Sequence, residues 1–115
     1  MLMKEKLEKM NIAFDFSNKF AIARVPFNYG DAENFALDCV YSLVPYVAEK
    51  LNIDYSKVVL VAISQDNKVV VFSVNSRDRD WLFYSFNTPS ISNAQLYDNV
   101  DPESIIEKLK ELYSK

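Results

Sequence analysis

The sequence of 115 residues contains no histidine, one glycine and one cysteine. Without histidine, the chain lacks the commonest general base of enzymes and the commonest ligand of transition metals. A single glycine, Gly30, excludes the glycine-rich loops that bind phosphate groups. A single cysteine, Cys39, cannot form a disulfide within the chain, and we expect it to be a small buried apolar residue. These absences argue against an enzyme, so we expect no catalytic residue, no cofactor and no bound metal.

The sequence also lacks a positive net charge and a long apolar run. Its formal charge is −3, whereas proteins that bind nucleic acid usually carry a basic excess that neutralises phosphates. No apolar run approaches the roughly 20 residues that span a bilayer. The first ten residues, MLMKEKLEKM, are too charged for the apolar core of a signal peptide. We therefore expect a cytoplasmic protein, with nucleic acid an improbable partner and no membrane contact.

Three apolar stretches are the most informative positive feature: residues 57–64 (KVVLVAIS), 68–74 (KVVVFSV) and 80–86 (DWLFYSF). Successive side chains of a strand point to opposite faces of its sheet. In the first stretch both sets of alternating positions are apolar: Val58, Leu60 and Ala62 on one face, and Val59, Val61 and Ile63 on the other. The pattern predicts a sheet whose two faces are both covered, by helices or by another molecule.

The remaining patterns complete a single α+β domain over residues 1–115. Residues 12–16 and 20–25 favour a hairpin, and the polar stretch 87–99 is predicted to be a loop or a cover. Helices are predicted over residues 1–10, over 31–51 and from Asp101, where an aspartate followed by proline and an acid favours a helix start. The predicted order is α-β-β-α-β-β-β-α, with a five-stranded, mainly antiparallel sheet and helices on both faces.

The central helix, residues 31–51, is more apolar than one sheet requires. Its apolar positions cover an arc of about 240° at 100° per residue. Asp31 is the predicted N-cap, and Pro45, on the polar side, should bend the helix without ending it. Either edge of the arc is therefore a candidate interface: Phe35, Cys39 and Tyr46 on one edge, or Tyr41, Val44 and Ala48 on the other.

The order of these elements resembles that of the roadblock/LC7 family, small dimeric modules related to the profilin and longin folds. The best local likeness runs from ENFALDCVYSLVPYVAEKLNI through KVVLVAISQDNKVVVFSV. The resemblance implies a sheet with helices on both faces and a dimer formed through the central helix and the adjacent strand. It also implies a role as a scaffold or regulator of small GTPases. It carries over no catalytic or binding residue.

Two polar groups are candidate sites. Arg77 and Arg79 beside Trp81 have the chemistry to bind phosphates and stack bases, but the adjacent aspartates cancel their charge, so a charged turn is favoured. The group of Asp98, Asp101 and Glu103 has the oxygen ligands of a hard cation. It lacks the spacing and the glycine of a calcium loop, and helix capping explains Asp101 and Glu103 more simply.

We therefore expect a non-enzymatic protein–protein interaction or regulatory module that acts as a dimer. The expected partner is a second copy of the chain, and a small GTPase or another host protein is a further candidate. Two alternatives remain open. One is a small nucleic-acid-binding protein that uses Arg77, Arg79 and Trp81. The other is a virus- or plasmid-encoded inhibitor of a host protein.

Overall fold

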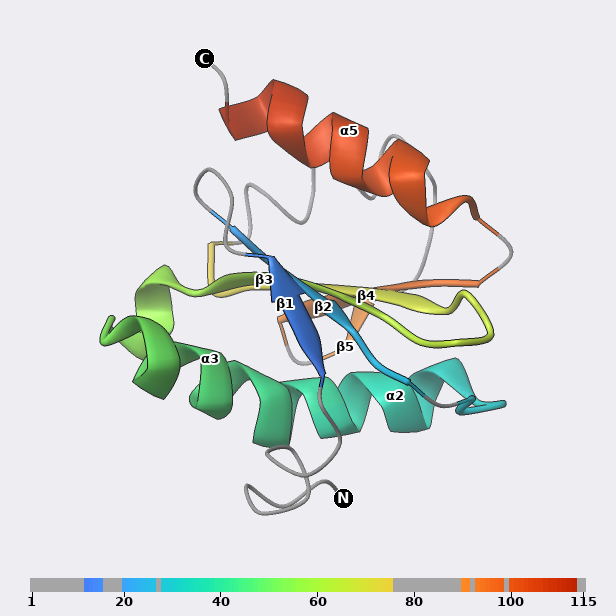
Figure 1. Ribbon diagram of the computed structural model, residues 1–115, viewed down its shortest axis with the longest axis horizontal. Helices are drawn as coiled ribbons and strands as arrows, with labels where there is room; N and C mark the ends of the chain where they lie inside the picture. Colours follow the sequence, from blue (N-terminus) through green and yellow to red (C-terminus); the bar gives the residue numbers. More distant parts are fainter. Residues whose placement is uncertain are drawn as a thin grey trace.

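The computed structural model describes residues 12–15, 20–26, 28–75, 90–91, 93–98 and 100–113. Within these ranges six strands form one sheet, in the order β1-β2-β3-β4-β6-β5. A long helix lies along one face of this sheet and a second helix lies along the other (Figure 1). The predicted α+β class is therefore confirmed.

The sheet is mixed. β1 (Ala13–Asp15) and β2 (Ala21–Arg24) form the predicted antiparallel hairpin, and β3 (Val59–Ile63) and β4 (Val69–Ser73) form a second one. β2 and β3 run parallel, because the long helix between them carries the chain back to the end of the sheet from which β2 started. The expectation of a mainly antiparallel sheet is thus met only in part. The described residues contain six strands, where five were predicted for the whole chain.

The chain after β4 differs most from the prediction. Residues 87–99, predicted as a loop, contain β5 (Ser90–Ile91) and β6 (Ala94–Tyr97), and β6 pairs with β4. β6 has only four residues and polar neighbours, so its local sequence looks like a loop; pairing with a distant strand makes it part of the sheet. The predicted strand 80–86 and the predicted helix 1–10 lie outside the described residues.

The long helix consists of α2 (Ala32–Asp38), a π-helical turn η1 (Cys39–Leu43) and α3 (Val44–Leu51), which follow one another without a break. Asp31 is the N-cap, as predicted, and its carboxylate accepts a hydrogen bond from the Glu33 N–H at 2.9 Å. Pro45 lies in the first turn of α3 and has no N–H to donate. The turn before it is widened, and the Val44 N–H bonds to the carbonyl five residues back. The helix continues through Pro45, as predicted, whereas the predicted bend stays a prediction.

Both faces of the sheet are buried, as the alternating pattern predicts. Toward the long helix the strands present several small side chains, which let the helix approach closely: Ala21, Ala23, Ala62 and Ala94. The opposite face presents larger side chains: Phe20, Ile22, Val61, Ile63, Val69 and Val71. These pack against α5 (Pro102–Tyr113) through Ile105, Ile106 and Leu109. The register keeps the two sets apart, since Ile22 pairs with Val61 and Ala23 with Ala62.

The cover provided by α5 can be tested at Leu109, which is completely buried against the sheet. Leu109→Ala removes this contact and leaves a cavity, so we expect the free energy of unfolding to fall by about 2–5 kcal/mol. The matched control Lys110→Ala, at the exposed next position, should change it by less than about 0.5 kcal/mol. Urea denaturation measures both. Equal unfolding midpoints would contradict the packing of α5 on the sheet.

Candidate functional site

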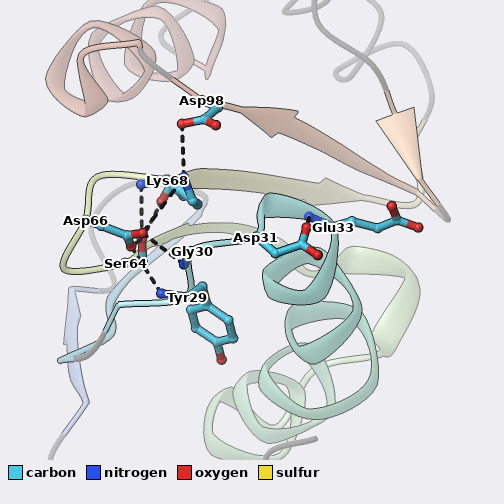
Figure 2. A network of polar contacts seen from close by, with 8 residues as sticks. All are labelled: Tyr29, Gly30, Asp31, Glu33, Ser64, Asp66, Lys68 and Asp98. Atoms are coloured by element: carbon cyan, nitrogen blue, oxygen red, sulfur yellow. Dashed lines mark hydrogen bonds and ion pairs between the residues drawn. The ribbon is translucent and has the colours of Figure 1, made fainter.

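A polar network fastens the loop before the long helix to the tip of the β3–β4 hairpin (Figure 2). The Asp66 carboxylate, in the hairpin turn, accepts hydrogen bonds from the backbone N–H groups of Tyr29 at 3.3 Å and Gly30 at 3.1 Å. The Ser64 hydroxyl donates to the same carboxylate. Gly30 has a φ of +73°, a left-handed conformation that glycine adopts without strain. The network fixes the position of Tyr29 and of the helix start behind it.

The turn of this hairpin lies between β3 and β4, at residues 65–66. The Asn67 N–H donates to the Ser64 carbonyl at 3.0 Å, and Asn67 takes a φ of 60°, which asparagine tolerates better than most residues. The Lys68 ammonium lies 3.2 Å from Asp98 Oδ1 and 3.8 Å from Asp66 Oδ2. Lys68 therefore bridges two carboxylates, one in the turn between β3 and β4 and one just after β6.

The acidic residues considered as cation ligands have structural partners. Asp98 pairs with Lys68. Asp101 begins the last helix, and its carboxylate accepts hydrogen bonds from the Glu103 N–H at 3.3 Å and the Ser104 hydroxyl at 3.4 Å. Within the described ranges no three histidine, cysteine, aspartate or glutamate residues are grouped to hold a metal ion. The capping interpretation of Asp101 is confirmed.

An open groove of about 580 Å³ lies beside the first half of the long helix. It is lined by Tyr29, Asn34, Leu37, Asp38 and Tyr41. The four helical residues are spaced i, i+3, i+4 and i+7, so one side of the helix supplies them. The fifth, Tyr29, comes from the loop that Asp66 holds, and its ring stacks on Phe35 with centroids 4.5 Å apart. The groove is thus built on fixed elements.

Asp38 gives this groove a negative charge. Burial raises the pKa of the Tyr29 hydroxyl, and the charge of Asp38 raises it further. Burial, and to a lesser degree Asp38, also raises the pKa of the Cys39 thiol. Both groups are therefore protonated at neutral pH, and neither is available there as a nucleophile or a base.

The long helix presents a row of uncharged residues that the core leaves accessible: Leu37, Tyr41, Pro45 and Ala48, here called the outer stripe. Spacings of three and four residues place them along one side of the helix. Tyr41 is 61% exposed, the most of any large apolar or aromatic residue in the described part of the chain. Leu37 and Tyr41 belong to both the outer stripe and the groove, so the two features form one surface.

The structure divides the six predicted interface residues into two groups. Phe35, Cys39 and Val44 are completely buried in the core between helix and sheet, so this fold leaves them no contact with a partner. Tyr41 is exposed, whereas Tyr46 and Ala48 are half-buried. The Tyr46 ring lies 5.6 Å from that of Phe14, and the Lys50 ammonium lies 5.4 Å from its centre. An interface on this helix would therefore use the second group, which contributes to the outer stripe.

The other predicted patch, Arg77, Arg79 and Trp81, lies outside the described residues, and its role stays a prediction. Sequence reasoning missed Tyr29 and its fixation by Asp66. Asp66 was not singled out as a site residue, and the signal available for Tyr29 was its place before the Gly30–Asp31 helix start. A contact between residues 37 positions apart leaves no local pattern.

Comparisons with protein-family models, with curated proteins and with solved structures each find no significant match to this chain. Across the described residues, no helix has both the length and the apolar character needed to cross a bilayer.

The Asp66 network predicts a pH-dependent contribution to stability. The pKa of Asp66 is lowered to about 2, chiefly by the Ser64 hydroxyl and further by the Gly30 and Tyr29 N–H groups. Since an unfolded aspartate has a pKa of about 3.9, the folded state is stabilised above that value, and the contribution is lost as pH falls toward the folded pKa. Asp66→Asn should therefore unfold at lower urea than wild type near neutral pH.

This difference should shrink as the pH falls from about 4 to about 2. Urea denaturation across this range measures it. Asp15→Asn is the matched control, because it removes the same charge from an exposed strand position away from the network. A difference that stays constant with pH, or one that Asp15→Asn reproduces, would contradict the role given to the Asp66 carboxylate.

Proposed function

We propose that the protein is a non-enzymatic protein–protein interaction module that acts as a homodimer through the outer stripe of its long helix. The observation that carries the proposal is the 61% exposure of Tyr41 in the middle of this helix. Tyrosine is enriched in protein interfaces, where its ring supplies contact area and its hydroxyl keeps a polar partner. The inner side of the same helix is already occupied by the sheet, so a partner on the outer stripe leaves the core undisturbed.

The size of the surface is compatible with a modest interface. The three parts of the long helix have seven, five and eight residues, which corresponds to about 30 Å at 1.5 Å per residue. A standard interface buries about 800 Å² per partner, more than one helix side usually offers. Further exposed apolar or aromatic residues lie at the end of the helix and just after it and can extend the contact: Leu51, Ile53 and Tyr55.

Two further considerations support this function. The chain has no histidine, and the raised pKa values of Tyr29 and Cys39 keep both groups protonated. The likeness in element order to the roadblock/LC7 family favours a dimeric regulatory module. A small GTPase or another host protein is then a candidate second partner.

Tyr41→Asp tests this function. It places a charge in the proposed contact, and we expect it to weaken dimerisation by about tenfold or more, as for a residue central to an interface. Sedimentation equilibrium should give wild type twice the 13.3 kDa chain mass and the variant a mass close to one chain. Circular dichroism should show that the variant stays folded, because Tyr41 is exposed.

The matched control is Lys110→Asp, which also introduces an aspartate, but on α5 at the opposite face of the sheet. It should remain dimeric. A wild-type protein that stays monomeric at high micromolar concentration would refute the dimer. Equal association of wild type and Tyr41→Asp would refute the outer stripe as its interface.

A further inference from the structure

The groove beside the long helix lies in a stretch of the chain that has no positively charged residue. Residues 25–49 contain Asp31, Glu33, Asp38 and Glu49 and neither lysine nor arginine, although the whole chain has 13 of these basic residues. Among the described residues, the five that line the groove likewise include one carboxylate and no basic side chain. A ligand that enters the groove therefore meets a negative potential from the groove and from the surrounding segment.

The groups that line the groove select among ligands. An anion would be repelled by Asp38, and a purely apolar side chain would remove the exposed Asn34 from water without replacing its hydrogen bonds. A cation has favourable contacts with every polar or aromatic group present. The Asp38 carboxylate and the Asn34 amide oxygen can each accept hydrogen bonds from the N–H groups of the cation. Tyrosine rings attract a positive charge to their faces.

We propose that this groove binds the cationic side chain of a lysine or arginine presented by a partner protein. Its volume of about 580 Å³ lies within the range of small-ligand sites, and its open form suits a side chain that arrives from a protein surface. Leu37 provides an apolar contact for the aliphatic part of such a side chain, and Asp38 binds its charged end.

The site is preorganised on the side of Tyr29. Asp66 holds the backbone of Tyr29 and Gly30, and the Tyr29 ring is stacked on the buried Phe35. Figure 2 shows the Tyr29 side chain extending from the polar network along the helix. The other wall, Tyr41, is exposed and belongs to the outer stripe, so a partner on that stripe lies next to the groove. In this sense the inference rests on the proposed function, which supplies the protein that carries the cation.

Titration of the ¹⁵N-labelled protein at low salt tests the inference, with Nα-acetyl-arginine amide and Nα-acetyl-lysine amide as probes. We expect saturable shifts of the Asn34, Leu37 and Asp38 amide signals at millimolar concentrations, because one side chain supplies only a few contacts. Nα-acetyl-citrulline amide, a neutral molecule of nearly the same shape as the arginine derivative, should cause no such shifts.

Variants then locate the charge that binds. Asp38→Asn should weaken binding of the arginine derivative about tenfold, and Asp38→Glu should keep most of it. The matched control Glu33→Gln, which removes a carboxylate outside the groove lining, should change the affinity less than twofold. Equal shifts with the citrulline derivative, equal losses in Asp38→Asn and Glu33→Gln, or no saturable shift up to about 50 mM probe would overturn the inference.

The same titration is made on wild type and on the variant Ala48→Asp. This substitution changes the outer stripe at a residue that does not line the groove. Binding to either form supports the inference. If the wild-type protein is a dimer and neither wild type nor Ala48→Asp binds the probes, the inferred binding site is contradicted, but the proposed function is not. If the wild-type protein is monomeric and still binds the arginine derivative, the proposed dimer is contradicted, but the inferred binding site is supported.

Discussion

Strands β3 and β4 carry apolar side chains on both faces, and the arrangement of the described elements follows from the need to remove both faces from water. Nine of their ten residues are buried, and only Val59 is half-buried. Burial of one valine, leucine or isoleucine contributes about 1.5–3 kcal/mol, whereas a domain is stable by only about 5–15 kcal/mol. Exposure of either face would therefore cost more free energy than the stability of the whole domain. The long helix and α5 supply the two covers (Figure 1).

This constraint also determines where a binding surface can lie. The inner side of the long helix is occupied by the sheet, and several alanines on the strands bring the helix close. The outer side is left with Tyr41, Pro45 and the groove. The π-helical turn η1 contains Tyr41 and ends where α3 begins, next to Pro45, so the irregular part of the helix and its most exposed aromatic residue coincide. Such turns are frequent at functional sites.

Much of the fold could be predicted because it is encoded in local patterns. Alternation identified the two faces of residues 58–63, and capping residues identified the helix starts at Asp31 and Asp101. Features that depend on distant partners could not be predicted. β6 becomes a strand only by pairing with β4, and the parallel pairing of β2 with β3 depends on the path of the whole helix.

The candidate site was predicted less well than the fold. The width of the apolar arc predicted a second contact surface on the central helix, which stays a prediction, but Phe35, Cys39 and Val44 belong to the core. Periodicity alone cannot tell how far a sheet curves around a helix, so it cannot separate a deep core contact from a surface contact. Tyr29 was not recognised as part of a site, because the bond that holds it joins two loops far apart in the sequence.

Hydroxyl-radical footprinting of dilute and concentrated wild-type protein tests most directly whether the outer stripe is the contact surface. We expect oxidation of Tyr41 to fall as the protein associates. Oxidation of Leu112, which is half-buried on the opposite side of the sheet, should stay unchanged. Constant oxidation of Tyr41 in protein that sedimentation shows to be dimeric would contradict the outer stripe as the contact surface.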